Sequence, residues 1–212
     1  ALHPHLALLF PLYLQSSAAD SVKSSVDGTV AGDLGLDARF TIFDRAAPLE
    51  LALAATVRFP TGDQNAYASD GKTTFWPRAL LSKQLGEDGT LINLSVGPVL
   101  RSDNTDSGLK VGSQLRATVG MLLALTREIG ATAELASSTA ASDPFARRTT
   151  PLEGALGGRL SFKSLMLGSS LGAGLTEGFG APDSRWLVTV AVPGSAYLPP
   201  APPPAARPAP AQ

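Results

Sequence analysis

Residues 33–59 read DLGLDARFTIFDRAAPLELALAATVRF, and two runs in this stretch alternate strictly between apolar and polar or small positions. In 33–42 the even positions are apolar, and the odd ones are charged, Gly or Thr. In 49–59 the odd positions are apolar, and the even ones are charged, Thr or Ala. A period of two is typical of a β-strand with one apolar face. The intervening DRAAP, 44–48, predicts a hairpin turn.

The same alternation recurs along the chain, and long and short connections alternate between the runs. Strands tilted across a bilayer need about 9–11 residues with this pattern, and transmembrane barrels join them by short periplasmic turns and long external loops. The sequence therefore predicts an all-β, antiparallel up-and-down transmembrane β-barrel. Ten strands are expected, at 5–15, 33–43, 49–59, 74–85, 91–101, 109–125, 129–137, 152–162, 165–175 and 185–193.

A soluble barrel or sandwich is the alternative fold. In a lipocalin-like calyx the apolar face points inward, so the second face must be polar and charged. Here the second face is sparsely charged and rich in Gly and Ala, which favours the crowded interior of a narrow barrel. Only 17% of the residues are charged, against about 25% in ordinary soluble domains. A surface that does not wholly face water is therefore expected.

Composition also excludes several classes of function. The 17 basic residues balance 18 acidic ones, so no attraction to nucleic acid is expected. The absence of cysteine excludes disulfides, thiolate metal sites and cysteine nucleophiles. No run approaches the ~18 consecutive apolar residues of a membrane helix.

If the apolar face contacts lipid, the other face lines a lumen. Charges of opposite sign in a confined interior should pair, because an unpaired charge is costly to desolvate. Such pairs either pack the lumen or line a narrow polar channel whose basic excess favours anions. The lumen-lining candidates are Asp33, Asp37, Arg39, Glu50, Arg58, Arg78, Lys110, Arg116, Glu134, Glu153, Arg159 and Arg185.

Four aromatic residues are expected at the membrane–water interfaces, where amphipathic rings gather. They are Trp76, Phe162, Trp186 and Tyr197. Their predicted role is structural.

Neither catalysis nor a metal or other cofactor is expected. His3 and His5 are the only histidines, with no carboxylate near them, and both belong to the predicted periplasmic end. No histidine remains in an external loop, so hydrolysis by a Ser-His or Asp-His arrangement is not expected. Asp103, Asn104 and Asp106 resemble part of a calcium loop, but the ligand spacing is incomplete. The sequence therefore predicts a protein that is not an enzyme.

The chain is expected to divide into a barrel, 1–195, and a periplasmic linker, 196–212. The segment YLPPAPPPAARPAPAQ, 197–212, is rich in Pro and Ala and predicts an extended polyproline-type spacer. The first and last strands are each joined to their neighbour by a long external loop. Both chain ends are therefore expected on the periplasmic side of a bacterial outer membrane.

Two loop motifs resemble a known family. Phe59-Pro60-Thr61-Gly62-Asp63 and Gly178-Phe179-Gly180-Ala181-Pro182-Asp183-Ser184-Arg185 look like loop segments in the barrel domain of OmpA-type outer-membrane proteins of myxobacteria, and more loosely like outer-membrane transporter barrels. The resemblance covers most of the chain and implies a barrel, a proline spacer, calcium-binding acidic repeats and a peptidoglycan-binding domain, with neither later domain in this chain. It also implies further strands, twelve in the full protein.

Three hypotheses for function follow from the sequence. The first is a barrel in outer-membrane lipid that tethers the envelope, through peptidoglycan bound by an absent C-terminal domain or through another envelope protein docked on the proline-rich tail. The second is a narrow channel for small solutes or anions. The third is a surface interaction module that works through the loops at 16–31, 60–73 and 138–150.

Overall fold

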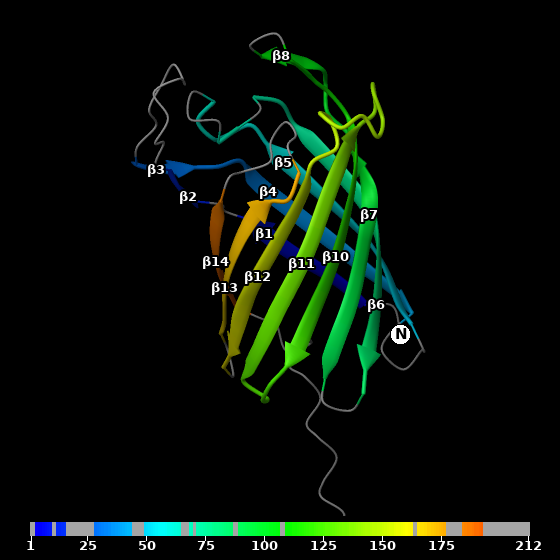
Figure 1. The fold of residues 1–212 in the computed structure, drawn as a ribbon, viewed down its shortest axis with the longest axis vertical. Helices are drawn as coiled ribbons and strands as arrows, with labels where there is room; N and C mark the ends of the chain where they lie inside the picture. Colours follow the sequence, from blue (N-terminus) through cyan, green and yellow to red (C-terminus); the bar gives the residue numbers. More distant parts are fainter. Residues whose placement is uncertain are drawn as a thin grey trace, which may run out of the picture.

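The computed structural model describes residues 3–9, 12–15, 28–43, 49–64, 68–69, 71–86, 89–106, 109–162, 165–176 and 184–192. Ten strands form one antiparallel sheet that curls around a common axis, in the order β1-β4-β5-β6-β7-β10-β11-β12-β13-β14 (Figure 1). Their bounds are β1 His3–Leu9, β4 Leu34–Phe43, β5 Glu50–Phe59, β6 Thr74–Leu85, β7 Thr90–Val99, β10 Gln114–Ala124, β11 Ile129–Ala140, β12 Leu152–Ser161, β13 Met166–Gly174 and β14 Arg185–Ala191.

Successive strands of this sheet are neighbours throughout, which is the up-and-down topology predicted from the sequence. β1 and β14 are the two edges of the sheet, and the described residues form no ladder between them. Ten strands alternate in direction, so the two edge strands are antiparallel to each other. The predicted fold class is confirmed, as a curled sheet that backbone pairing between the described strands does not close.

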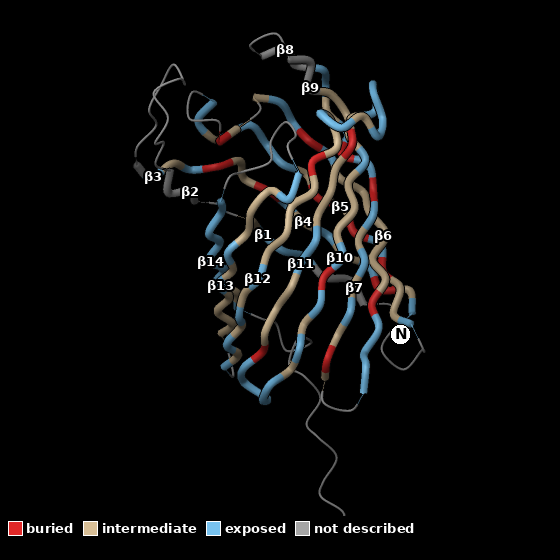
Figure 2. The backbone as a smooth tube through the Cα atoms, in the orientation of Figure 1, coloured by how far each residue is buried: buried red, intermediate tan, exposed pale blue. Residues whose placement is uncertain are grey.

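The apolar side chains of the strands point away from the sheet axis. Leu36, Val119, Leu156 and Leu171 are 40%, 48%, 70% and 67% exposed. Figure 2 shows exposed and less exposed positions alternating along the strands, as a period of two requires. Among the described residues the buried apolar ones are few and small: Ala52, Ala54, Ala68 and Val99. The molecule thus has an apolar exterior around a polar or small interior, the reverse of a soluble calyx.

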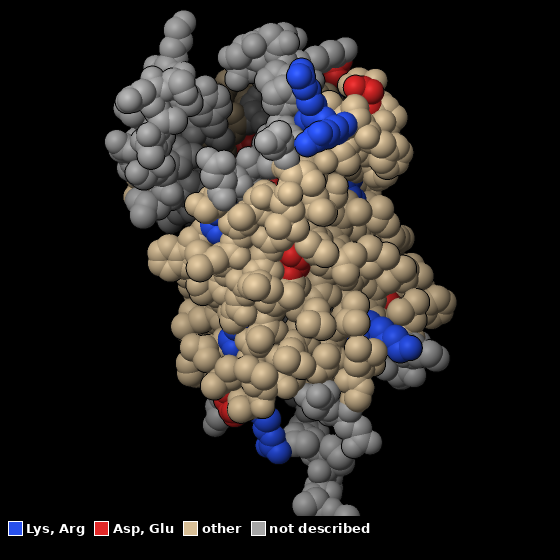
Figure 3. All heavy atoms as spheres, viewed as in Figure 1, with Lys and Arg blue, Asp and Glu red and all other residues tan. Residues whose placement is uncertain are grey.

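The surface over the strands carries few charges, as Figure 3 shows for one face. Within the part of the chain that the structure describes, no helix is long and apolar enough to cross a membrane.

Long and short connections alternate between the ends of the sheet, as predicted. The long ones include 60–73, 100–113, 141–151 and 175–184, and the short ones include 86–89, 125–128 and 162–165. His3, the first residue of β1, pairs with Thr41, and Ala191, the last residue of β14, pairs with Met166. Both positions lie at the short-turn end, so β1 begins and β14 ends there.

The predicted first strand, 5–15, is divided in the structure. β1 joins the large sheet, whereas β2, Leu12–Gln15, pairs with β3, Gly28–Ala31, in a separate two-stranded sheet. Pro11 falls between β1 and β2, and a proline has no N–H to donate to a ladder. The prediction of a continuous strand was wrong here, as was the prediction that 28–31 belongs to a polar loop.

The predicted strand 109–125 is also divided. β9, Leu109–Val111, pairs with β8, Asn104–Asp106, in a small sheet beyond the large one, and only β10 continues into the wall (Figure 1). Ser113 interrupts the apolar series at this point. Its hydroxyl donates to the Arg101 carbonyl at 3.2 Å and accepts from the Arg101 N–H at 3.3 Å. These bonds hold the chain where β10 begins. β11 also extends past its predicted end at 137 to Ala140.

The ladder between β6 and β7 has one gap, and two prolines explain it. Phe75 pairs with Leu100, and Ala79 pairs with Val96, so Pro77 lies opposite Pro98 between them. Phe75 and Leu100 exchange both backbone bonds, at 2.9 and 2.8 Å. Hydrogen-bonded pairs alternate along an antiparallel ladder, so Pro77 and Pro98 occupy a position where two N–H donors are needed. Neither proline has one.

The apolar exterior leads to a prediction about Leu135, which is 49% exposed near the middle of β11. We expect Leu135→Arg to lower the free energy of unfolding in lipid vesicles by about 2–4 kcal/mol, because it places a charge in hydrocarbon. Thr132→Arg on the same strand is the matched control, because Thr132 lines the interior. Equal effects of the two variants in urea titrations of the folded protein would contradict this orientation of the sheet.

Candidate functional site: the interior of the barrel

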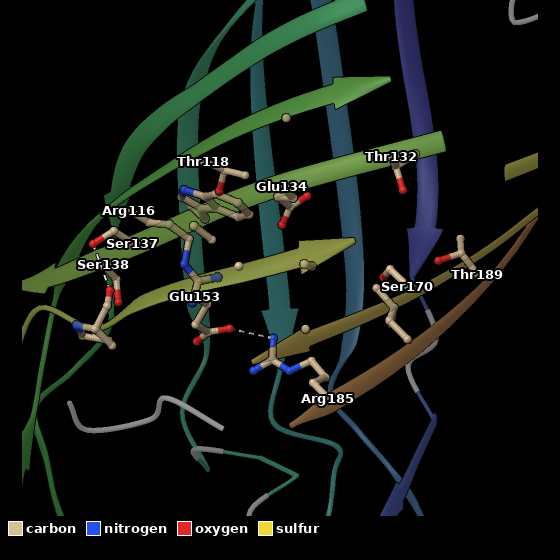
Figure 4. A pocket seen from close by; sticks show the side chains of 18 of the residues that line it. Arg116, Thr118, Thr132, Glu134, Ser137, Ser138, Glu153, Ser170, Arg185 and Thr189 are labelled. Carbon is tan, nitrogen blue, oxygen red and sulfur yellow. Dashed lines mark hydrogen bonds and ion pairs between the residues drawn. The ribbon is translucent and has the colours of Figure 1, made fainter. Parts of the chain in front are cut away.

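The sheet encloses a cavity of about 1420 Å³ (Figure 4). Small residues on β12 and β13, including Ala155, Gly168, Ser170 and Gly172, leave this space open. Gln64, Ser69 and Lys72 line it in the long loop 60–73, whereas Leu122, Thr132, Met166 and Thr189 line it near the short turns. The lining residues thus extend from one end of the strands to the other. The interior therefore contains free volume in addition to packed side chains.

An ion-paired layer covers the inner face of β4, β5 and β6. Arg78 Nη2 donates to both carboxylate oxygens of Asp37, at 2.8 Å to Oδ1 and 2.7 Å to Oδ2. Arg78 Nη1 donates to the Thr56 hydroxyl at 2.6 Å. Arg39 pairs with Glu50 on the neighbouring strand. The side chains of Arg78 and Asp37 are only 13% and 15% exposed. These charges therefore pair, as the sequence predicted, and fill this side of the lumen.

Trp76 joins the ion-paired layer to the cavity. The Arg78 guanidinium lies 4.3 Å from the centre of its ring, and the Arg116 guanidinium lies 5.4 Å from it. Both distances are in the range of a cation–π contact. The structure thus places Trp76 inside the barrel, lining the cavity, which differs from its predicted place at a membrane interface. Its position in the sequence already indicated the inner face, because it alternates with Phe75 and Pro77.

Glycine at position 97 makes room for this arrangement. β7 lies between β6 and β10, and Gly97 is the direct partner of Arg116. A Cβ at Gly97 would lie 2.0 Å from the Pro77 carbonyl oxygen and 2.8 Å from the Arg78 Cβ. No side chain fits there. Trp76 and Arg78 can therefore approach Arg116 across β7.

Arg116 is in a different situation from the paired arginines. It projects from β10 into the cavity, opposite Ser138 on β11. Its guanidinium donates no hydrogen bond and forms no ion pair with the residues that the structure describes. The sequence grouped Arg116 with the other lumen charges and gave no signal that it would differ.

The remaining predicted lumen residues lie in several places. Arg185 on β14 pairs with Glu153 on β12 at 3.3 Å, and both line the cavity with Glu134 and Arg159 (Figure 4). Asp33 accepts a hydrogen bond from the Gly62 N–H at 3.0 Å and so anchors the loop after β5. Arg58 is exposed at the loop end of β5.

Lys110 departs from its predicted place. It lies on β9, in the small sheet formed with β8, and so is not part of a strand of the barrel wall. The prediction counted 109–125 as one strand, whereas the structure separates β9 from β10.

Two of the other predicted interface aromatics lie on the exterior. Trp186 is 68% exposed and Phe162 is 54% exposed. The Trp186 indole N–H donates to the Ser169 hydroxyl on β13 at 2.9 Å. Tyr197 lies outside the described residues.

Sequence reasoning missed the neutral polar lining. Ser and Thr hydroxyls at inward positions of β10, β11, β13 and β14 line much of the cavity: Thr118, Thr132, Ser138, Ser170 and Thr189 (Figure 4). Their inward parity was present in the sequence, but the predicted lumen-lining residues were all charged. Among the described residues no group of three or more His, Asp or Glu side chains can hold a metal ion. The side chains of His3, His5, Asn104 and Asp106 lie outside that description.

No protein-family model matches the chain, and no curated protein matches it. Among solved structures, the chain is similar to the crystal structure of the COG4313 outer membrane channel from Pseudomonas putida F1. The TM-score is 0.64 at 20% sequence identity, and the alignment covers 89% of this chain and 74% of the other. The fold is therefore that of an outer-membrane β-barrel. The similar structure is a channel, and the predicted membership of the OmpA-type family stays a prediction.

Two ion pairs that differ in their exposure to solvent give a stability prediction. We expect Arg78→Ala to lower the free energy of unfolding by about 3 kcal/mol, because it leaves the Asp37 carboxylate shielded from water without its partner. Arg185→Ala is the matched control and should cost less than about 1 kcal/mol, because the Arg185 and Glu153 side chains are 56% and 26% exposed.

Urea titration of both variants measures the difference. The Asp37→Ala variant and the Asp37→Ala, Arg78→Ala double variant complete a cycle for the buried pair. If Arg78→Ala is no more harmful than Arg185→Ala, the layer on β4–β6 does not stabilise the barrel.

Proposed function

We propose that the chain forms an outer-membrane channel for small hydrophilic solutes. The observation that carries this proposal is the cavity of about 1420 Å³, with lining residues from the long loops to the short turns. A barrel that serves only as an anchor needs no such space, because side chains can fill a narrow barrel completely. The ion-paired layer occupies one side of this lumen, and small residues keep the other side open.

The lining favours polar solutes over apolar ones. Serine, threonine and charged side chains offer hydrogen-bond donors and acceptors along the cavity, which can replace the water around a solute as it passes. The fold shared with a protein described as an outer membrane channel supports the same function. In this arrangement the short turns and both edge-strand termini, His3 and Ala191, face the periplasm, and the long loops face the outside.

The anchoring role and the interaction role remain predictions. Anchoring depends on the linker 196–212, which lies outside the described residues, as does the boundary of the barrel at 195. Peptidoglycan, or an envelope protein bound to that linker, is likewise untested. Of the three loops predicted to bind a partner, the structure describes 138–150 throughout and the other two in part.

Single-channel recording in a planar bilayer tests the proposed function. The folded chain should give steady conductance steps in KCl, with folding verified by its heat-modified mobility on a gel. A folded barrel without conductance would contradict the channel and favour the anchor.

Gly168 and Leu156 allow a matched test that the cavity is the conducting path. Gly168 on β13 lines the cavity, and a Cβ there meets only ordinary contacts, at 3.6 Å to the Thr189 Cβ. Gly168→Trp should therefore fold and lower the conductance by about half or more, because the ring occupies the lumen. Leu156 on β12 is 70% exposed on the exterior and is not among the residues that line the cavity. Leu156→Trp should leave the conductance unchanged. Similar conductance in both variants would exclude this cavity as the path.

A further inference from the structure

Arg116 has a guanidinium beside Trp76 whose N–H groups are open. Its central carbon lies over the Trp76 ring, 5.4 Å from the ring centre. A cation–π contact uses the π-system of the ring and takes up no lone-pair acceptor, so the guanidinium can still bind an oxyanion bidentately. No described residue accepts a hydrogen bond from it. The guanidinium therefore projects into the cavity with its donors unused.

The charges around Arg116 are mostly positive. Arg58, Arg101 and Arg185 are close enough to act on it electrostatically, and Glu153 is the one described carboxylate with a comparable influence. Glu153 already holds Arg185 at 3.3 Å. An anion that enters from the long-loop end therefore meets a basic region. The one described carboxylate there, Glu153, is already paired with Arg185.

Two hydroxyl groups complete this region. Ser138 is the direct cross-strand partner of Arg116, and Thr118 is the next inward residue of β10. Both line the cavity beside Arg116 (Figure 4). A hydroxyl rotates freely and can donate to an oxygen that the guanidinium holds.

We infer that Arg116, Ser138 and Thr118 form a binding site for an oxyanion, the carboxylate or phosphate group of a small solute, within the lumen. The site deepens the proposed channel function by naming the solute class, and it rests on that function. Arg116 supplies the charge and a bidentate edge, and the hydroxyls bind the remaining oxygen atoms.

Glu134 sets the depth of the site. It projects into the cavity from β11, further toward the short turns than Ser138, and forms no ion pair with a described residue. A carboxylate there repels an anion, so the anion remains at Arg116 rather than moving on unhindered.

The fluorescence of Trp76 reports on the site directly. The chain has 2 tryptophans, so Trp186→Phe leaves Trp76 as the single tryptophan, and its emission is excited selectively at the red edge, where tyrosine does not absorb. In the full chain carrying this change, iodide should quench Trp76 more strongly than caesium does, because the region attracts anions. Inorganic phosphate and acetate should each compete with iodide and restore the fluorescence, at an ionic strength held constant with fluoride.

Variants in the same background identify the residues. Arg116→Gln should weaken the protection by phosphate about tenfold or more, because hydrogen bonds to a charged group are lost. Arg116→Lys should keep the preference for iodide but weaken phosphate binding, because an ammonium has no bidentate edge. Ser138→Ala should weaken phosphate binding by a smaller factor than Arg116→Gln does. Arg127→Gln is the control, since Arg127 is exposed in the short turn 125–128 and should change nothing.

Each result decides the inference. The site is supported if phosphate no longer protects Trp76 from iodide in Arg116→Gln, while Arg116→Lys, Ser138→Ala and Arg127→Gln respond as expected above. No protection by phosphate or acetate in the parent protein, or equal protection in Arg116→Gln, overturns it. If Arg116→Gln does not fold, the contrast of Arg116→Lys and Ser138→Ala with Arg127→Gln decides instead.

The quenching assay is independent of conduction, so the site and the channel can fail separately. Phosphate binding without conductance would contradict the channel alone. Conductance that phosphate leaves unchanged, without protection of Trp76, would contradict the site alone. If both are present, phosphate should reduce the current of the parent protein and have about tenfold less effect on Arg116→Gln.

Discussion

The contact of apolar side chains with an apolar surrounding is the constraint on which this structure depends. The strands turn Leu, Val, Ile and Phe outward, and the buried apolar side chains among the described residues are three alanines and one valine. No interior core of large apolar groups is formed by these residues, so burial against one another cannot hold the sheet together. Lipid on the outside satisfies the apolar face, and the backbone ladders satisfy the polar groups of the main chain.

The outward turn of the apolar side chains determines what the interior contains. With the large residues outside, the inward positions are free to carry charges, hydroxyls and glycines. These are distributed unevenly. The inner face of β4–β6 holds paired charges, of which Asp37 and Arg78 are shielded from water, whereas β12 and β13 present small residues to an open cavity. One wall is therefore packed, and the opposite wall provides space for a solute.

Trp76 lies where the packed wall meets the open one. Its ring contacts the Arg78 guanidinium, which the carboxylate of Asp37 holds, and also contacts Arg116, which no described carboxylate holds. The contact crosses β7 at Gly97, where a side chain would collide with the backbone of β6. Arg78 donates its terminal N–H groups to Asp37 and Thr56, whereas no described residue accepts a hydrogen bond from Arg116. This difference separates a structural arginine from one able to bind a solute.

The sequence by itself determined the fold class, most of the strands and the inward or outward direction of their side chains. A period of two assigns a face to every residue from local information alone. It also determined the alternation of long and short connections. It did not place the ends of strands where a proline or a polar residue replaces a ladder bond, as at Pro11 and Ser113, and so it assigned Lys110 to the wall.

Only the tertiary structure decided which charges meet. Asp37, Thr56 and Arg78 come from three strands, and Arg116 approaches Trp76 across a strand that lies between them. Such contacts depend on strand register and on the curvature of the sheet, which a one-dimensional pattern does not contain. Parity therefore predicted that Asp37, Arg78 and Arg116 face the lumen, whereas their partners, the place of Trp76 among them and the open N–H groups of Arg116 followed only from the fold in three dimensions.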